Sequence, residues 1–319
     1  MGGRTAAAYP AVMPRTRTRL YAAPTLALAI FLGSALSAQA AAPIAHSAKS
    51  PAEVAAYWTK DRMRGAIPRD TVRSNSAHAT AGKPSGGGTS WSRLAVPTPY
   101  SGTDRDSGKV FFTLGGVNYV CSGTSVAASA GLSLVWTAGH CTNEGPGAYA
   151  TNFMFAPAYI DGTAPYGKWA GTTIQTTSQW AGSGDFTYDV GAVRVVPGAG
   201  APPNTTLANI QAPRAMAFNY GVTLNSTRFK SYGYPAAGKF NGQRMYMCDS
   251  AVIRRDGSGT GAPMGIGCDM TGGSSGGGWI VGGNLYSENS YGYDNQPNVM
   301  FGPYLGSVAQ SVHNAASAG

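Results

Sequence analysis

Two adjacent serines, Ser274 and Ser275, lie within a run of glycines in the stretch CDMTGGSSGGGW, residues 268–279. A glycine-rich stretch is often a flexible linker. Here a cysteine opens the stretch, and Trp279 with the following apolar pair closes it, which is typical of the edge of a packed strand. A serine hydroxyl becomes a useful nucleophile at neutral pH only when a nearby base accepts its proton. The sequence must therefore supply a histidine for one of these serines.

The chain contains four histidines. His46 and His78 lie in an N-terminal region that we expect to be a propeptide, and His313 lies near the C-terminus in a tail of small residues. His140, in VWTAGHC, follows an apolar strand that ends at small residues, so its imidazole is expected at the rim of a sheet. A lone histidine beside a cysteine is more often structural than catalytic, but elimination leaves His140 as the candidate base.

The stretch around His140 resembles the T-A-A-H-C motif of chymotrypsin- and trypsin-like serine proteases, with Gly139 in place of the second alanine. Downstream, YDVGAVRVV is similar to the D-[IV]-A-[LV] strand start of that family. This similarity nominates Asp189 as the acid that orients the histidine. Asp185, four residues earlier, lacks the aliphatic strand that follows and is expected to be a turn residue.

The sequence G-S-S-G-G matches the family's G-D-S-G-G, with Ser274 in place of the aspartate and Ser275 at the nucleophile. The T-G-G-x-S-G form is most similar to secreted bacterial glutamyl-endopeptidase-like enzymes. The resemblance covers roughly residues 109–305. It implies a triad of His140, Asp189 and Ser275 that hydrolyses peptide bonds through an acyl-enzyme, with no metal or organic cofactor.

The glycines before the nucleophile have a purpose in this chemistry. An oxyanion hole needs two backbone N–H groups that converge on the developing negative charge, and the resemblance assigns them to Gly273 and Ser275. In trypsin-like zymogens, the aspartate at position 274 pairs with the new N-terminal amine after cleavage; Ser274 has no charge for such a pair. Gly278 stands where the family usually has a proline, and the sequence offers no reason for it.

The resemblance also nominates residues of a substrate pocket. Asp269 stands where trypsin-like enzymes place the acid that recognises Arg or Lys, although an aspartate in a turn is more often only a turn residue. Ser290, Tyr291 and Gly292 resemble the strand of the pocket wall that pairs with the substrate backbone. No histidine follows the nucleophile at the place where glutamyl endopeptidases use one, so the preferred side chain cannot be read from the sequence.

The elements that must position these residues are strands. Charged residues make up only 12% of the chain and it has 45 glycines, a composition that suits short strands joined by tight turns. Six segments from about residue 109 onward mix β-branched or aromatic residues with glycine turns, and only VMFGPYLGSVAQSVHNAA, residues 299–316, could form a helix. We predict an all-β fold, and the resemblance implies two antiparallel six-stranded β-barrels with a short C-terminal helix and a small N-terminal propeptide helix.

That propeptide helix is expected over residues 50–65. Ser50 and Glu53 fit a capping box, Pro51 suits the first helical position, and Gly65 suits the C-terminal exit. Its apolar side would carry Val54, Tyr57 and Trp58. The alternative is that this helix simply packs on the mature fold.

The four cysteines allow three pairings of two disulfides. Two local loops are the simplest answer, Cys121 with Cys141 and Cys248 with Cys268, and the family commonly links the strand before the histidine to the residue after it. The second bridge would close a loop ahead of the nucleophile. No C-x-x-C pair with nearby histidines is present, so we predict no metal site.

Arginines followed by an apolar run and small residues at the N-terminus predict a signal peptide over residues 1–40, cleaved near Ala40 or Ala42. A propeptide and linker would cover residues 41–93, and the protease domain residues 94–319. Without residues 1–40 the formal charge falls from +9 to +5, and no basic cluster indicates nucleic-acid binding. We expect a secreted monomer that acts on proteins or peptides and does not bind a membrane once the signal is removed.

Two other functions fit parts of the pattern. G-x-S-x-G at 273–277 also satisfies the nucleophile elbow of α/β-hydrolase esterases. In that fold the histidine follows the serine in the chain, and here only His313 follows Ser275. A protease-shaped binding protein without turnover is the second alternative, and such proteins generally lack one triad residue. This chain lacks none.

Overall fold

In the computed structural model, the fold described below is that of the compact unit within Gln39–Gly319. Apart from residues 1–3, the predicted signal peptide lies outside the described residues, as do its cleavage site and His78. Of His46, only the backbone is described. The residues that the structure describes are 1–3, 44–47, 49–69, 72–73, 90–129 and 131–318.

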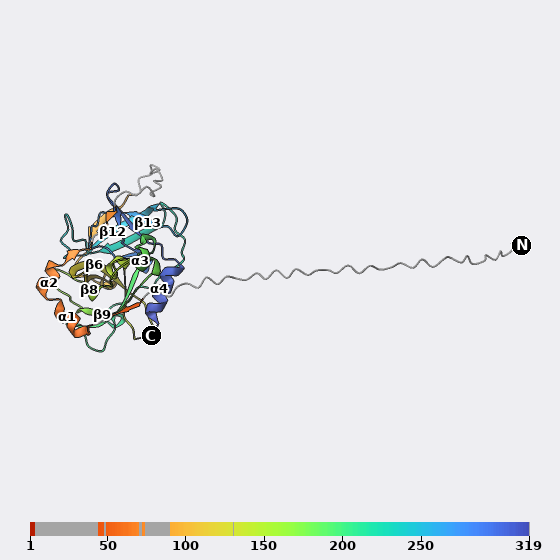
Figure 1. Ribbon diagram of the computed structural model, residues 1–319. Helices are drawn as coiled ribbons and strands as arrows, with labels where there is room; N and C mark the ends of the chain where they lie inside the picture. Colours follow the sequence, from red (N-terminus) through yellow and green to blue (C-terminus); the bar gives the residue numbers. More distant parts are fainter. Residues whose placement is uncertain (4–43, 48, 70–71, 74–89, 130, 319) are drawn as a thin grey trace. The chain divides into compact units, whose positions relative to one another are not determined.

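The first barrel consists of six antiparallel strands (Figure 1). They are β5 (Ser107–Leu114), β6 (Val117–Val126), β7 (Leu134–Thr137), β8 (Thr151–Pro157), β9 (Trp169–Thr176) and β10 (Gly191–Pro197). In space they follow the order β9, β10, β7, β6, β5, β8, and β8 pairs again with β9, which closes the ring. Fully buried aromatic side chains such as Phe112, Phe155 and Trp169 fill the interior, which explains why these strands are rich in large apolar residues.

The second barrel contains β11 (Arg228–Gly233), β12 (Tyr246–Arg255), β13 (Met264–Gly267), β14 (Gly278–Val281), β15 (Asn284–Glu288) and β17 (Val299–Gly302). Their order is β15, β14, β11, β12, β13, β17. In the described part of the chain no ladder joins β17 back to β15; the residues after β15 instead meet β17 through an isolated bridge between Tyr291 and Phe301. The predicted all-β fold of two barrels is confirmed, with the second barrel only partly closed. It excludes the esterase alternative, which needs helices around a mostly parallel sheet.

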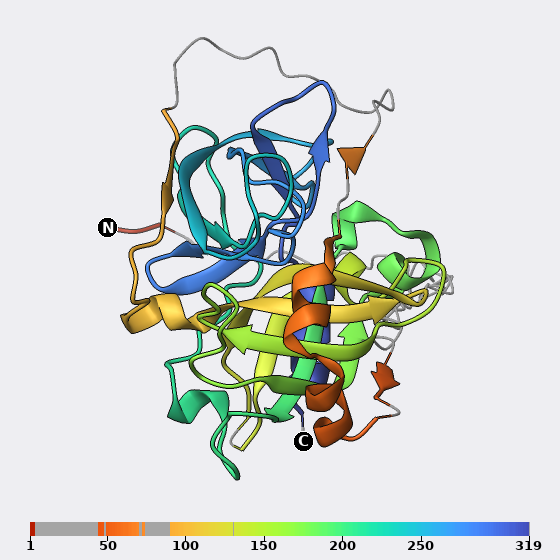
Figure 2. The ribbon, with the colours of Figure 1, turned by 90° about the vertical axis from the view of Figure 1, so that its left-hand side faces the viewer.

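Shorter elements complete the chain (Figure 2). The strands are β1 (Ile44–His46), β2 (Ile67–Pro68), β3 (Val72–Arg73), β4 (Ser92–Ala95) and β16 (Gly292–Tyr293); the 3-10 turns are η1 (Gly102–Asp106), η2 (Gly139–Cys141), η3 (Phe186–Tyr188) and η4 (Leu207–Asn209); the helices are α1 (Pro51–Tyr57), α2 (Lys60–Gly65), α3 (Ser178–Ser183) and α4 (Ser307–Ser317). β1 joins β9 and β2 joins β6, both on the first barrel, whereas β4 joins β12 on the second.

The single helix predicted over residues 50–65 is wrong: the structure has two, α1 and α2. The predicted capping box is present, because Ser50 N–H donates to Glu53 Oε2 at 2.8 Å and Ser50 Oγ accepts from Glu53 N–H at 3.3 Å. The break follows from Thr59, whose hydroxyl accepts from Arg62 N–H at 3.3 Å and so caps a new helix. Trp58, between the helices, is fully buried.

The predicted C-terminal helix is also shorter than expected. Residues 299–302 form β17, which pairs with β13, and Pro303 follows. The helix α4 begins only at Ser307 and packs against β9 and β10 of the first barrel. Arg194 of β10 donates to the carbonyl of Ala316 at 2.7 Å, which satisfies a carbonyl in the last turn of the helix. None of the helices in the described residues is long and apolar enough to cross a membrane.

Candidate active site

His140 and Asp189 lie in direct contact. His140 lies in η2, just after β7, and Asp189 lies two residues before β10; β7 and β10 pair side by side. Asp189 Oδ2 is 2.8 Å from His140 Nδ1, and Oδ1 accepts from the backbone N–H of His140 at 2.7 Å. Both side chains are buried, with 1% and 0% exposed. A hydrogen bond from Nδ1–H to the carboxylate leaves Nε2 as the acceptor nitrogen of the ring.

Two more polar side chains surround the carboxylate. Ser290, predicted as part of the pocket wall, donates a short hydrogen bond to Asp189 Oδ2. Glu288 is fully buried, and its Oε2 accepts from Trp136 Nε1 at 2.9 Å. Burial raises the pKa of Glu288 well above its ordinary value, and the charge of Asp189 acts in the same direction. Both effects favour the protonated form of Glu288, and nothing in its local sequence marks this residue.

Gly139 departs from the family's alanine for a steric reason. A Cβ atom at this position would lie 2.9 Å from Asp189 Oδ1 and 2.9 Å from Cγ of Trp180. Trp180 belongs to α3, and its ring centroid lies 6.1 Å from that of His140. The indole fills the space that an alanine methyl group would need. The tryptophan at 180 therefore requires a glycine at 139.

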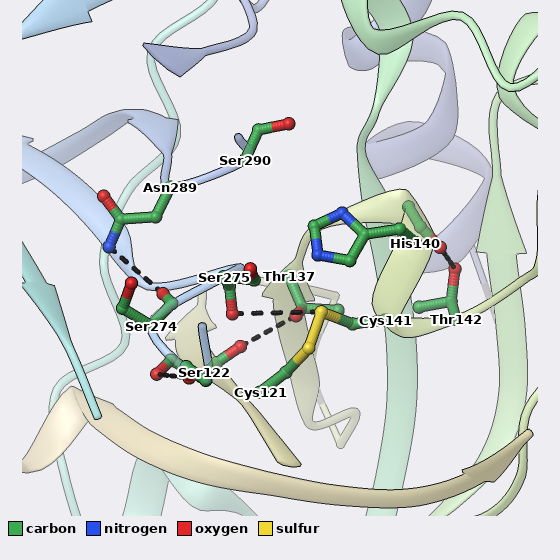
Figure 3. The surroundings of a disulfide bond; sticks show 12 residues. Cys121, Ser122, Thr137, His140, Cys141, Thr142, Ser274, Ser275, Asn289 and Ser290 are labelled. Atoms are coloured by element: carbon green, nitrogen blue, oxygen red, sulfur yellow. Dashed lines mark hydrogen bonds between the residues drawn. A yellow bond between two sulfur atoms is a disulfide. The ribbon is translucent and has the colours of Figure 1, made fainter. Parts of the chain in front are cut away.

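Ser275 lies beside His140 (Figure 3). Its carbonyl accepts from Ser122 N–H at 2.7 Å and lies 3.9 Å from Sγ of Cys141, the residue that follows His140. Figure 3 shows the imidazole on the side of Ser275, and Nε2 of His140 has no hydrogen-bond partner in the described part of the chain. The arrangement offers the acceptor nitrogen of the ring to the serine.

The backbone at the predicted oxyanion hole has two free donors. Neither Gly273 N–H nor Ser275 N–H donates to another group within the described residues, whereas the N–H of Ser274 between them donates to Thr271 O at 3.1 Å. Gly273 has a φ of 94°, and a Cβ atom there would lie 2.8 Å from the carbonyl oxygen of Tyr234. Only glycine fits this conformation and this space.

Side-chain hydrogen bonds hold this loop where an ion pair is absent. Ser274 Oγ donates to Thr271 O at 2.8 Å, and Ser122 Oγ, from the first barrel, donates to Gly273 O at 2.9 Å. Asn289 Nδ2 donates to Ser274 O at 3.1 Å. Ser122 and Asn289 are functional candidates that sequence reasoning missed. They give the loop that carries Ser275 neutral anchors on both barrels.

Two disulfides support the site. Cys121–Cys141 joins β6 to η2, directly after His140, and Cys248–Cys268 joins β12 to the start of the nucleophile loop. Each joins residues 20 apart, so each contributes on the order of 3 kcal/mol by restricting the unfolded chain. These are the pairings expected from the sequence.

The donor atoms of Cys121, His140 and Cys141 lie within 4.8 Å of one another, a spacing that could hold a metal ion. The two sulfur atoms are joined in a disulfide, however. Zinc and related metals bind the deprotonated thiolate of cysteine. This donor set, with its sulfurs oxidised, does not fit a metal.

Gly278, which replaces the family's proline, has a structural explanation. Its backbone N–H donates to Thr124 Oγ1 at 3.1 Å, across the interface between the barrels. A Cβ atom at 278 would lie 2.7 Å from the same oxygen and 2.9 Å from Cδ1 of Leu285. A proline would remove the donor and crowd both neighbours.

Replacing Gly278 with proline is therefore expected to lower the free energy of unfolding by about 3 kcal/mol, because a buried acceptor loses its donor and the ring overpacks the interface. Thr124→Val, which removes only the acceptor, should cost about 1 kcal/mol. Denaturant titration of each variant measures these changes. Gly261→Ala, at a position with open space around it, is the control. A Gly278→Pro protein as stable as the parent would contradict this explanation.

A cavity of about 260 Å³ opens beside Ser275. The predicted pocket residues Asp269, Ser290, Tyr291 and Gly292 all line it. Oδ2 of Asp269 already contacts two cations, Lys239 Nζ, with which it forms a short hydrogen bond, and Arg93 at 3.4 Å. This carboxylate is therefore compensated by the chain itself, which argues against recognition of a basic substrate side chain.

No known protein-family model matches the chain. A match to a curated protein, the extracellular metalloprotease of Bacillus subtilis (strain 168), has 33% identity over 87 residues and spans 26% of that protein. The chain thus covers only about a quarter of the length of this relative, and the metal named for it belongs to that protein.

Matches to solved structures cover more of this chain. The protease Anisep from Arthrobacter nicotinovorans is 41% identical, with 72% of this chain and 100% of Anisep covered and a TM-score of 0.60. The thermostable serine protease AL20 from an extremophilic microorganism is also 41% identical, with 67% and 97% covered and a TM-score of 0.60. A Glu endopeptidase shares the fold at 22% identity and a TM-score of 0.54, with 71% and 97% covered. The chain therefore belongs to the chymotrypsin- and trypsin-like superfamily of serine proteases.

Proposed function

We propose that this protein is a secreted serine endopeptidase whose triad consists of His140, Asp189 and Ser275. The observation that carries the proposal is the buried pair of His140 and Asp189, with Nδ1 at 2.8 Å from the carboxylate and Nε2 left without a partner in the described residues on the side of Ser275. Neutral serine needs such an oriented base before it can attack a peptide carbonyl.

The steps follow from these positions. His140 Nε2 accepts the proton as Ser275 Oγ attacks the carbonyl carbon, and Asp189 stabilises the imidazolium that forms. The N–H groups of Gly273 and Ser275 stabilise the oxyanion, together by several kcal/mol if each contributes as such donors typically do. His140 then protonates the leaving amine, and water releases the acyl group from Ser275 by the reverse path. Ser290 holds the carboxylate of Asp189 during both steps.

The proposed maturation removes a signal at residues 1–40 and a propeptide and linker at 41–93. In support, 72% of this chain covers 100% of the solved Anisep chain, so the rest of this chain has no counterpart in that structure. The strand β4 (Ser92–Ala95) pairs with β12 of the second barrel, so this strand lies at the boundary at which we propose that the protease domain, residues 94–319, begins. The two disulfides are typical of exported proteins and support secretion.

We also propose that maturation needs no salt-bridge switch at the oxyanion hole. The chain described here still contains its N-terminal segment, yet Gly273 N–H and Ser275 N–H have no acceptor among the described residues. Neutral hydrogen bonds from Ser274 and Ser122 hold the loop. We further expect a monomer that acts on proteins and peptides and has no nucleic-acid or membrane partner.

Incubation of the processed protein with a mixed peptide library, followed by mass spectrometry, tests the activity and the specificity together. We expect internal cleavage that is absent with Ser275→Ala. We expect no enrichment of Arg or Lys before the cleaved bond, because Lys239 and Arg93 already compensate Asp269. An intact library would contradict the proposed activity, and strong enrichment of Arg or Lys would contradict the account of Asp269.

A further inference from the structure

The N-terminal arm, meaning the described residues between 44 and 73, crosses the first barrel and ends at the substrate pocket of the second. Its helices α1 and α2 lie over the first barrel, and its strands add to three different strands of the protease, β9, β6 and β16. Figure 2 shows the helices of the arm lying across the front of the first barrel.

Trp58 anchors the arm. Its side chain is fully buried, its ring centroid lies 5.4 Å from that of Phe111, and its Nε1 donates to the carbonyl of Asn152 at 2.6 Å. It shares a cluster with Met154 and Tyr159 of the first barrel. Tryptophans inserted in this way are the residues that dominate the affinity of protein interfaces.

Polar contacts flank the anchor. Tyr57 Oη donates to Asn118 Oδ1 at 2.9 Å, and Lys168 Nζ donates to the carbonyl of Trp58 at 2.6 Å. Further along, the N–H of Arg69 donates to Val120 O at 3.0 Å, next to the pairing of β2 with β6. The buried tryptophan and these hydrogen bonds join the arm directly to the first barrel. The binding of the arm there therefore does not depend on the residues that follow it in the chain.

The end of the arm lies at the pocket. Val72 pairs with Gly292 and Arg73 with Tyr293 in a parallel ladder, and both Gly292 and Tyr293 line the cavity beside Ser275. A peptide that binds along the edge of a strand needs its free N–H and C=O groups. The arm takes up these groups, so a substrate cannot pair with the same strand. In this form of the chain, Ser275 is only 6% exposed.

We propose that the arm is an inhibitor of this protease: it docks on the first barrel through Trp58, covers β16 through Val72–Arg73, and stays bound after the chain is cut behind it. The inference rests on the proposed peptidase function. The chain resumes at β4, which is anchored separately on β12, so a cut within residues 74–89 leaves two pieces that each keep their contacts. Before the cut, the linker holds the arm at a high effective concentration; afterwards, its binding depends on dilution.

The test uses the full chain with a cleavage site for an unrelated, sequence-specific protease inserted within residues 74–89. The rate at which a fluorophosphonate labels Ser275 is measured before and after the cut, over a series of dilutions. The uncut chain should label slowly at every concentration. The cut chain should label on the order of tenfold faster, but only after dilution, because the competent fraction rises as the arm dissociates.

Three variants separate the contributions of the arm. Trp58→Ala should move the dilution midpoint to a concentration on the order of 30-fold higher, as expected for loss of a central interface tryptophan. Asp61→Ala, in α2 of the same arm but with a side chain that is 91% exposed, should leave the midpoint unchanged. If Trp58→Ala prevents folding, Val72→Pro with Arg73→Pro keeps the anchor, removes the N–H groups of β3, and should let the uncut chain label about as fast as the diluted cut chain.

Equal labelling rates in the uncut chain, the cut and diluted chain and the Val72→Pro, Arg73→Pro chain would overturn the inference and leave the arm as an ordinary part of the fold. The proposed peptidase function survives that result, because Ser275 is labelled throughout. Absence of labelling in every form overturns the peptidase function itself, and the inhibitor proposal with it.

Discussion

Ser275→Ala is expected to lower kcat for peptide hydrolysis by about 10⁶-fold, the loss that removal of a triad nucleophile typically causes. In the proposed mechanism the hydroxyl of Ser275 forms the covalent bond to the substrate, and no other group takes this role. KM should change by no more than a few-fold, because the walls of the pocket stay in place. Steady-state kinetics on a chromogenic peptide, with the processed protein, measures both parameters.

Ser274→Ala is the matched control, since the two serines are neighbours. Ser274 Oγ donates one hydrogen bond, to Thr271 O at 2.8 Å, and does not enter the chemistry. Its loss should cost about 1 kcal/mol, or roughly fivefold in kcat if all of it falls on the transition state. A larger loss for Ser274→Ala than for Ser275→Ala would mean that the wrong serine has been assigned.

Asp189→Asn is expected to lower kcat by about 10⁴-fold. The carboxylate accepts hydrogen bonds from His140 N–H, His140 Nδ1–H and Ser290 Oγ–H. An amide can offer only one oxygen to these donors. With its NH₂ group toward the ring, it would place the imidazole proton on Nε2, and the ring could then no longer accept the proton of Ser275.

Asp185→Asn provides the control for that variant. Asp185 lies four residues earlier, and its Oδ1 accepts from Thr187 N–H at 2.9 Å, so it caps η3. An asparagine can keep this bond, because its side-chain oxygen is also an acceptor. We expect kcat within about twofold of the parent, since surface changes away from a special feature cost little. An equal loss in both variants would remove the distinction between the two aspartates.

The motifs that were predictable from the sequence are short and contiguous. His140, Asp189 and Ser275 each lie in a short stretch that resembles a motif of the family, and these resemblances, in the family's order, nominated them. The all-β class was predictable from aromatic and β-branched residues between glycine turns, whereas the two barrels were implied by the family resemblance. Only the partial closure at Tyr291 and Phe301 depends on how the strands meet in space.

Other contributions could not be predicted because they depend on distances between remote segments. Gly139 looked like a mild substitution until Trp180, in a helix far along the chain, was found in the space of the missing methyl group. Ser122 is an ordinary serine in the sequence, and only the packing of β6 under the nucleophile loop shows that it binds Gly273 O. Glu288 has no local signal that marks it as a buried carboxyl group whose pKa is raised by burial.

The N-terminal region contains one feature that local sequence predicts and one that it does not. Ser50 and Glu53 cap a helix by local rules, and the sequence identified them correctly. The break at Trp58 was missed because its cause is tertiary packing. The indole lies between the two helices and packs into a cluster on the first barrel. Local propensity cannot indicate such a tertiary site.

The most direct test of the account is fluorophosphonate labelling of the protein freed from its N-terminal arm, with the adduct located by peptide mass spectrometry. We predict a single adduct on Ser275 that is absent from Ser275→Ala and from the unfolded protein, and that forms much more slowly in His140→Ala. An adduct on Ser274, or a folded protein that takes up no label at all, would contradict the assignment of this site.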